Sequence, residues 1–505
     1  MFRSQRQTTN TRQWDVPLAA SRRPGATPGR SVAKPSTSGV SARHPFGNVA
    51  DNERLYRYES GIKQAYDNIV PVLKRISALQ HETDFERQAQ KLAQSELGFE
   101  LPAEILAHAW IEQLDMRRLF AWCVFATYQQ ACQQFYTTDP LATVESDDFQ
   151  EFLQQCGFHT RDISPCADGR LAHVIRYVLR LPQRVVRRKS FAGAMFDIDD
   201  SIQKWVETEM FRYREGRPNL AEEPTRYLKL VAYHFSSVDP EHEGCAAHGS
   251  DTQKAAGAGL AQLEAFKQAF ENSFCCGASI DLLLIGVDTD TDSLRVHVPN
   301  SDGKIALDRF VDTLDVYKVT RFGSTSEGRD FIANQVRSCA PDAEPGMMKL
   351  VAQLVENNLS QVDYVRCHHG EAYPDTGHAE RFIGAGVGFE DIQLRNLMYF
   401  AYLDTVEEAT QDLDVGIKIF SGLNVSHGLP IPVVVRFDYH GQVPGARERA
   451  IAHCDRVANA ITERYRDLSE QGLLHIMQAV RDCRGDASIE VLACSVNADS
   501  GAEMH

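Results

Sequence analysis

Three residues that can bind or activate a metal ion occur at alternate positions in one short stretch: Cys166, Asp168 and Arg170. They lie between an extended-looking segment, residues 157–163, and an apolar run, residues 171–181, that we expect to be helical. A turn from a strand into a helix is where α/β proteins usually bind ligands and metals. A cysteine beside an arginine near a helix N-terminus favours the thiolate, the form that binds metals. Arg170 can hold Asp168 by a charge-assisted hydrogen bond.

Cys-x-Asp-x-Arg on such a turn resembles the zinc motif of the β-class carbonic anhydrases. Other blocks resemble a divergent branch of that class, the shell carbonic anhydrases of α-carboxysomes. The resemblance implies an α/β fold with an N-terminal helical domain, a β-carbonic-anhydrase-like, mostly parallel sheet, and a second, degenerate half of the same kind without metal. The blocks that carry it are residues 156–159, 162–171, 233–235, 244–250, 275–281 and 286–292.

The resemblance implies one zinc ion per chain, bound by Cys166, His234 and Cys245. His234 lies near the end of residues 228–235, an almost continuous apolar run that predicts a strand buried on both faces. Two thiolates and one imidazole are the soft ligands that zinc prefers, and three protein ligands leave the position open that catalysis needs. In most β-class members the second thiolate follows the histidine after only two residues. Cys245-x-x-His248 therefore leaves His248 as an alternative to His234.

The activity that the resemblance implies is the reversible hydration of carbon dioxide to bicarbonate. Zinc lowers the pKa of a bound water to about 7, and the resulting hydroxide attacks carbon dioxide. Two roles are open to Asp168: held by Arg170, it accepts a hydrogen bond from that hydroxide, or it binds zinc and closes the site. A closed site gives the alternative function, a non-catalytic carboxysomal scaffold with a structural zinc ion. His248, His242 and His159 are candidates for the proton relay.

The composition is that of an ordinary globular protein. The chain is 43% hydrophobic and 24% charged, and no apolar run approaches the roughly 18 residues of a membrane span. We expect neither a secretion signal nor a membrane partner. Twelve scattered cysteines predict a reduced intracellular protein and not a disulfide scaffold.

Charge is distributed unevenly along the chain. The net charge is −16, yet residues 1–50 hold eight Arg and Lys against one acid. This segment is rich in Ser, Thr, Pro and Gly, so we expect a disordered basic tail that binds a partner. The resemblance implies that this partner is Rubisco, a shell protein or both, at the inner face of a carboxysome shell. It also implies a homodimer or a larger assembly such as a hexamer. Nucleic acid is not expected, because no aromatic platform is interleaved with the charge.

Periodicity divides the rest of the chain into three parts. Residues 51–143 have apolar residues at helical spacing and predict a helical domain, in which Pro71 should kink or end the first helix. Residues 144–389 alternate strands and helices and predict the catalytic zinc domain, with a largely parallel sheet. Residues 390–505 repeat the alternation of strands and helices but have no second Cys-x-Asp-x-Arg. We expect a pseudo-duplicate of the catalytic domain there, without metal.

Single elements are also predicted from the apolar patterns. Strands are expected over residues 228–235, 281–287, 294–298, 433–439 and 489–494, and helices over residues 85–97, 103–128, 254–274 and 447–474.

Overall fold

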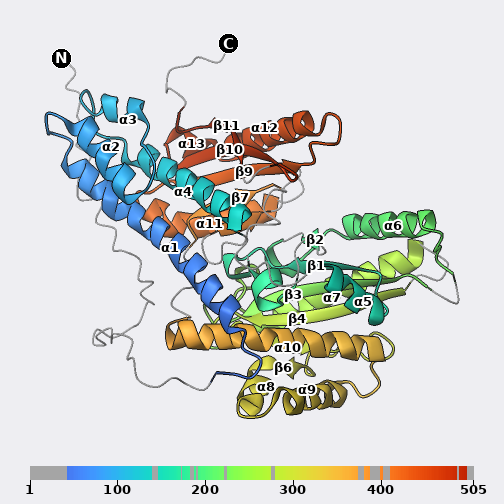
Figure 1. The fold of residues 1–505 in the computed structure, drawn as a ribbon. Helices are drawn as coiled ribbons and strands as arrows, with labels where there is room; N and C mark the ends of the chain where they lie inside the picture. The colour runs from blue at the N-terminus through green and yellow to red at the C-terminus, as the bar shows by residue number, and fades with distance from the viewer. Residues whose placement is uncertain are drawn as a thin grey trace.

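The protein consists of an N-terminal group of helices and two β-sheets, shown from blue through green to red in the computed structural model of Figure 1. The structure describes most of the chain between Arg43 and Asn497. The described residues are 43–138, 146–171, 173–181, 187–188, 191–220, 224–273, 279–373, 380–386, 398–401, 410–485 and 488–497.

The N-terminal helices share a core with the C-terminal sheet. Their buried apolar side chains pack together with Phe382, Val434 and Met477 of that sheet. The predicted helical region is confirmed, but its core is continuous with that of the last part of the chain. The helices are α1 (Val49–Ala78), α2 (Phe85–Glu96), α3 (Ala103–His108) and α4 (Met116–Thr138).

Two predictions about these helices differ from the structure in part. Pro71, expected to kink or end the first helix, does not end it, because α1 continues to Ala78. The neighbouring Val72 and Leu73 are buried, and this tertiary packing outweighs the backbone hydrogen bond that proline cannot donate. The single helix expected over residues 103–128 is divided in two, because the side chain of Asp115 accepts the Arg118 amide and starts α4 anew.

The fold begins before residue 50. His44 is only 3% exposed, and its ring stacks on Tyr317 with 4.3 Å between centroids. Its Nε2 lies 3.1 Å from Thr320 Oγ1. The predicted disordered tail, residues 1–50, therefore extends too far. Residues 43–50 belong to the folded part, because they contact residues that are distant in the sequence. Residues 1–42 lie outside the described residues.

The first sheet has the strand order β2-β1-β3-β4-β5-β6. β2, β1, β3 and β4 are parallel, while β5 and β6 are antiparallel to their neighbours. The predicted parallel sheet is thus confirmed. Its strands are β1 (Thr160–Pro165), β2 (Arg187–Arg188), β3 (Arg226–Phe235), β4 (Ser279–Asp288), β5 (Leu294–His297) and β6 (Val311–Asp312).

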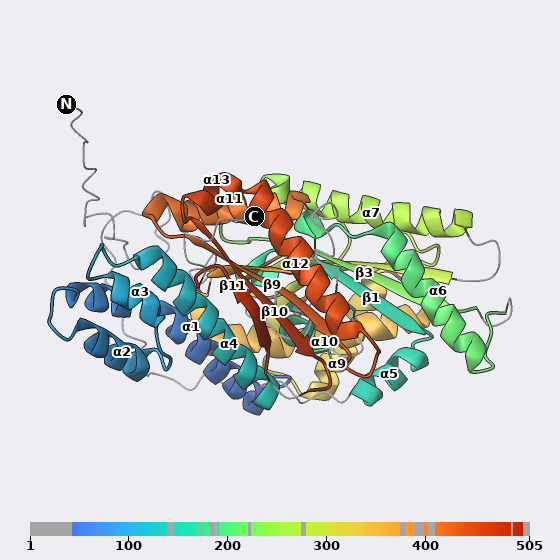
Figure 2. The same cartoon turned by 90° about the horizontal axis from the view of Figure 1, so that it is seen from above.

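Helices pack around this sheet. α6 and α7 contact β1, β3 and β4, and Figure 2 shows them along one side of these strands. α8, α9 and α10 form a layer below the sheet in Figure 1. The helices of this half are α5 (Ser146–Gln155), α6 (Ile198–Arg214), α7 (Thr252–Ser273), α8 (Thr313–Thr320), α9 (Thr325–Cys339) and α10 (Pro345–His368).

The second sheet repeats the topology of the first. Its order is β11-β10-β9-β7-β8, with β8, β7, β9 and β10 parallel and β11 antiparallel. Read in chain order, the strands correspond one for one to β1 through β5, which confirms the predicted second half. Its elements are β7 (Phe382–Ala385), β8 (Met398–Ala401), α11 (Thr410–Leu423), β9 (Ile431–Tyr439), α12 (Ala446–Arg464), α13 (Arg466–Glu470), β10 (Leu474–Asp482) and β11 (Glu490–Cys494).

The strand registers show which residues of the second half correspond to two candidate ligands. Cys166 directly follows β1, and His234 lies two residues beyond the β3 partner of the last β1 residue. The same two positions relative to the β7–β9 ladder hold Gly386 and Phe437. Neither residue has a side chain that binds zinc, so the duplicated half lacks these two ligands.

Two boundaries in the second half differ from expectation. β7 starts at Phe382, so the second half begins before the predicted boundary at residue 389. The helix expected over residues 447–474 ends earlier, and Leu474 is already the first residue of β10. Gly472, with φ 64°, adopts the left-handed conformation that commonly ends helices. No strand was predicted over residues 475–482, which form most of β10.

A buried ion pair lies inside the first sheet. Lys229 Nζ donates to Asp162 Oδ2 at 2.7 Å, and the two side chains are 1% and 4% exposed. Ser164 and Ser201 hydroxyls lie 2.9 and 3.0 Å from the same ammonium. Residues 228–235, whose apolar pattern predicted β3, therefore include one fully buried charged side chain, that of Lys229.

Lys229→Met is expected to lower the free energy of unfolding by about 3–5 kcal/mol, because it leaves the Asp162 carboxylate buried without its cation. Urea unfolding followed by circular dichroism measures the change. The matched control is Lys254→Met, since the Lys254–Asp251 pair is exposed and should contribute less than about 1 kcal/mol. A similar loss in both variants would show that the buried pair has no special weight.

Candidate metal centre

Cys166 is placed by the end of the first strand. It directly follows β1, and its amide donates to Ala232 O on β3 at 3.0 Å. The side chain is 3% exposed. The thiol therefore lies at the carboxyl end of the parallel strands, where α/β sheets hold their ligands.

His234 is the penultimate residue of β3 and is 1% exposed. Neither of its ring nitrogens has a hydrogen-bond partner, although a buried imidazole normally has at least one. Its Nε2 lies 3.4 Å from Asp168 Oδ2, a contact too long to satisfy the nitrogen well. The ring thus has an unused acceptor that a metal ion would occupy.

Cys245 lies in the loop that leads from β3 to α7. Its carbonyl accepts the amides of His248 and Ser250, both at 3.0 Å, so the loop is tightly turned. The thiol is 3% exposed, and its Sγ lies 3.9 Å from Cys166 Sγ. Two thiolates at 2.3 Å from one tetrahedral zinc ion would be roughly 3.8 Å apart. The spacing of the two sulfurs therefore fits a shared metal.

The three side chains form one buried group. Their ligand atoms all lie within 4.8 Å of one another, and among the described residues no other such group occurs. The hydrogen bond between the two thiols, together with burial, raises the pKa of Cys166, while the same bond lowers the pKa of Cys245. Cys245 is therefore the thiol of the pair that ionises first, and a cation would favour ionisation of both. The residues present fit a soft divalent metal such as zinc.

The other predicted histidines lie elsewhere. His248, the alternative ligand, has its Nε2 3.2 Å from Gly193 O and does not belong to the group. His159 accepts the Arg226 amide at the opposite end of β3, away from the thiols. His242 is exposed and bonded to Asp239, which raises its pKa.

Asp168 and Arg170 form the pair that their spacing predicted. Arg170 Nε donates to Asp168 Oδ1 and Nη2 donates to Oδ2, each at 2.9 Å, and both side chains are buried. The Arg170 amide also donates to Oδ1 at 2.9 Å. Arg170 Nη1 is anchored on the carbonyl of Glu243 at 2.7 Å. Both carboxylate oxygens are therefore held by the guanidinium beside the group of possible ligands.

Sequence reasoning missed several supports of this turn. The run from residue 171 to 181 forms only a short π-helical turn, Val174–Val178, after the 3-10 turn η2 (Gly169–Leu171). The anchor of Arg170 at Glu243 comes from the neighbouring loop, and Thr289 Oγ1 lies 3.4 Å from its Nη1. These contacts join residues more than seventy positions apart, so no local pattern could indicate them.

Gly244, next to Cys245, has no room for a side chain. A Cβ there would lie 2.5 Å from Ser250 O and 2.8 Å from Ser250 Cα. Gly244→Ala is expected to lower the free energy of unfolding by about 1–3 kcal/mol and to weaken metal binding, since the loop must shift. Thermal unfolding and competition with a chromophoric chelator measure both effects. Gly257→Ala is the control, because its Cβ meets nothing within 4 Å and helix propensity favours alanine.

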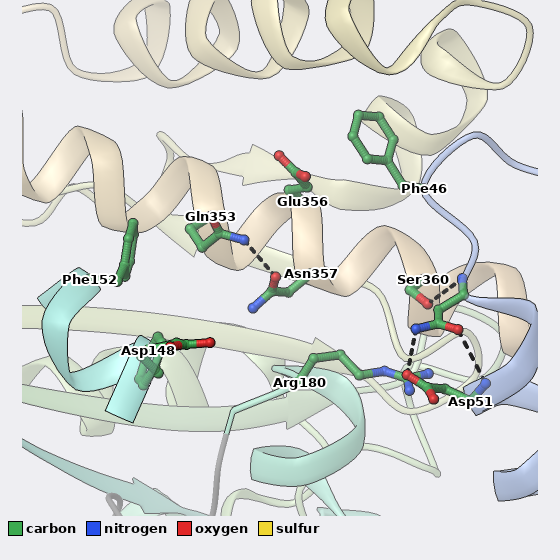
Figure 3. Close-up of a pocket in the computed structure, with 11 residues that line it drawn as sticks. Phe46, Asp51, Asp148, Phe152, Arg180, Gln353, Glu356, Asn357 and Ser360 are labelled. Carbon is green, nitrogen blue, oxygen red and sulfur yellow. Dashed lines mark hydrogen bonds between the residues drawn. The ribbon is translucent and has the colours of Figure 1, made fainter. Parts of the chain in front are cut away.

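A separate cavity of about 390 Å³ lies between α5, α10 and the segment that precedes α1 (Figure 3). None of the residues that line it belongs to the Cys-His-Cys group. Arg180 enters it, and its Nη2 donates to Asn52 Oδ1 at 2.7 Å and to Gln361 Oε1 at 2.9 Å. Asn52 and Gln361, which hold Arg180, lie outside the lining of this cavity, and the metal-capable group remains the candidate site.

Helices that could span a membrane were sought among the described residues, and none is both long and apolar enough.

The fold and the site define an α/β protein with a duplicated sheet and one buried group able to hold a metal ion. Comparisons with known proteins agree with this class. The N-terminal, catalytic and C-terminal models of the carboxysome shell carbonic anhydrase match residues 44–136, 148–378 and 379–496.

Relatives resemble the chain over almost its whole length. Carboxysome shell carbonic anhydrases are 52% identical in Prochlorococcus marinus (strain MIT 9313), over 98% of each chain, and 46% identical in Halothiobacillus neapolitanus, over 87% of this chain and 88% of the relative. The relative in Parasynechococcus marenigrum (strain WH8102) is 53% identical over 94% of this chain and 83% of its own. The chain belongs to the carboxysome shell carbonic anhydrase family, and the prediction that it is an enzyme of this class is confirmed.

Proposed function

We propose that the chain binds one zinc ion through Cys166, His234 and Cys245 and catalyses the reversible hydration of carbon dioxide to bicarbonate. The observation that carries the proposal is the buried Cys-His-Cys group, in which both ring nitrogens of His234 lack a hydrogen-bond partner. Bound there, zinc would supply a water whose pKa is lowered to near neutrality. Two thiolates and a neutral imidazole suit zinc in charge and softness.

Asp168 and Arg170 are proposed to keep the site open. A carboxylate that accepts three hydrogen bonds from Arg170 is held in place and is costly to transfer to the metal. Arg170 holds both oxygens of Asp168, and the remaining lone pairs of this carboxylate can accept a hydrogen bond from the attacking water. This orientation of the nucleophile favours catalysis over the structural zinc site of a scaffold.

Stopped-flow measurement of carbon dioxide hydration, with zinc quantified in the same sample under reducing conditions, tests the proposal. We expect about one zinc per chain and a rate far above the uncatalysed reaction. Bound zinc without catalysis would identify a closed or structural site. Catalysis without zinc would remove the Cys-His-Cys group from the mechanism.

The cellular role is proposed from the family and from charge. The relatives are named carboxysome shell carbonic anhydrases, which supports a place at the inner face of a carboxysome shell, where the enzyme would supply carbon dioxide to Rubisco. The basic residues 1–42 would bind Rubisco or a shell protein, and the body would form a homodimer or a larger assembly. Deleting residues 1–42 should abolish binding to purified partner in biolayer interferometry while leaving hydration intact. Full binding by the truncated chain would refute the role of the tail.

A further inference from the structure

We infer that the degenerate C-terminal half positions the metal loop, defined as residues 166–170, and that Ala167 is the residue through which it does so. The inference rests on the proposed function, because the loop carries Cys166, Asp168 and Arg170. It assigns a task to a half that lacks two of the three ligands. Ala167 is thus a positioning residue that touches neither the metal nor the substrate.

The side chain of Ala167 belongs to the core of the other half. It is fully buried, and every other fully buried member of its apolar cluster lies between Ile383 and Val480 in the second half. Cys166 and Asp168, its immediate neighbours, face the metal group instead. A single methyl group on the metal loop is therefore held by the C-terminal core.

The backbone of the loop is held from both sides. The amide of Cys166 donates to Ala232 O of the first sheet, whereas the amide of Ala167 donates to Phe191 O at 3.1 Å. The ring of Phe191 packs against the core of the second half. The two halves meet beside this loop: β8 contacts η2 at the end of the metal loop, and α11 contacts η5 (Ala192–Ala194).

The second half also contributes a charged residue that interacts with Arg170 of the metal loop. Glu380 lies two residues before β7 of the second sheet and is 1% exposed. Burial alone would lower the pKa of the Arg170 guanidinium, but the carboxylates of Asp168, Glu380 and Glu243 raise it overall. The second half thus adds negative charge around the arginine that holds Asp168.

Because the core around Ala167 is closely packed, the metal loop should be sensitive to the volume of the side chain at position 167. Protein cores have no space for an added methyl group without a shift of the backbone or of neighbouring side chains. Because a sheet is stiffer than a loop, the metal loop should yield first, and Cys166 and Asp168 would move with it. Substitutions of residues that hold metal ligands in place typically reduce metal affinity or activity by about 10–100-fold.

The test uses the full chain loaded with cobalt, whose visible spectrum reports ligand geometry, beside the zinc form. For Ala167→Val we expect a changed cobalt spectrum, about 10–100-fold weaker metal binding and a comparable loss of hydration rate. Ala458→Val is the matched control, because Ala458 is 2% exposed in the same core but lies on α12. It should lose stability in thermal unfolding while keeping the wild-type spectrum and rate.

Each result decides between the alternatives. If Ala167→Val keeps the wild-type spectrum, affinity and rate, the inference is wrong. If that variant does not fold, Ala167→Gly decides, since removing the methyl group should also change the spectrum and weaken binding, and an unchanged site would again overturn the inference. If the wild type binds neither cobalt nor zinc, the proposed function itself fails, which is a different outcome from a failure of Ala167.

Discussion

Cys245→Ser is expected to remove most of the bound zinc and to lower the rate of carbon dioxide hydration by more than about 100-fold. This loss exceeds the usual effect of changing a residue that only supports the ligands. A serine hydroxyl remains protonated at neutral pH and is a poor zinc ligand, so only Cys166 and His234 would hold the ion. Zinc content and stopped-flow hydration on the same sample measure both consequences.

The control for this variant is Cys454→Ser. Cys454 is fully buried in the second half, where its thiol lies 3.4 Å from Val435 O. Serine can keep that hydrogen bond, and we expect wild-type zinc content and rate. If Cys245→Ser retained its zinc instead, another side chain such as His248 would have to be the third ligand.

Asp168→Asn is expected to lower the hydration rate by about 100- to 10,000-fold while one zinc per chain is retained. An amide cannot accept on both atoms from Arg170, and it leaves a buried guanidinium without its counter-charge. Stopped-flow kinetics, zinc quantification and thermal unfolding together separate loss of orientation from loss of the fold.

This variant also separates the two roles that the sequence left open for Asp168. If the carboxylate closed the site by binding zinc, its removal would raise the rate and not lower it. Asp239→Asn is the control, since Asp239 pairs with the exposed His242 outside the metal group. A rate for Asp168→Asn equal to that of this control would show that the Asp168–Arg170 pair is only a structural salt bridge.

Much of the fold could be predicted from local patterns. The apolar run at residues 228–235 gave β3, and residues 254–274 gave α7, because a buried strand and an amphipathic helix each have their own period. The spacing of Cys166, Asp168 and Arg170 indicated a turn and an ion pair, which the structure places at the end of β1.

The features of the fold and the site that local patterns did not predict depend on contacts between segments that are distant in the sequence. Pro71 is tolerated because of tertiary packing, and β10, for which no strand was predicted, is defined by its pairing with β9. The closeness of His234 to the two thiols follows from the β1–β3 register, which one sequence does not reveal. Which ligands bind zinc remains a prediction, as do the roles of Asp168 and Arg170.

The core shared by the N-terminal helices and the C-terminal sheet has a consequence for synthesis. α4 ends at Thr138, yet the sheet it covers begins at Phe382, so roughly 250 residues must be translated between them. At about 5–20 residues per second, the helices wait tens of seconds on the ribosome with their apolar face uncovered. The first sheet, whose strands and helices lie within residues 146–368, can form during that interval. Synthesis of the second sheet, and not the start of translation, would then determine when the apolar face of these helices is covered.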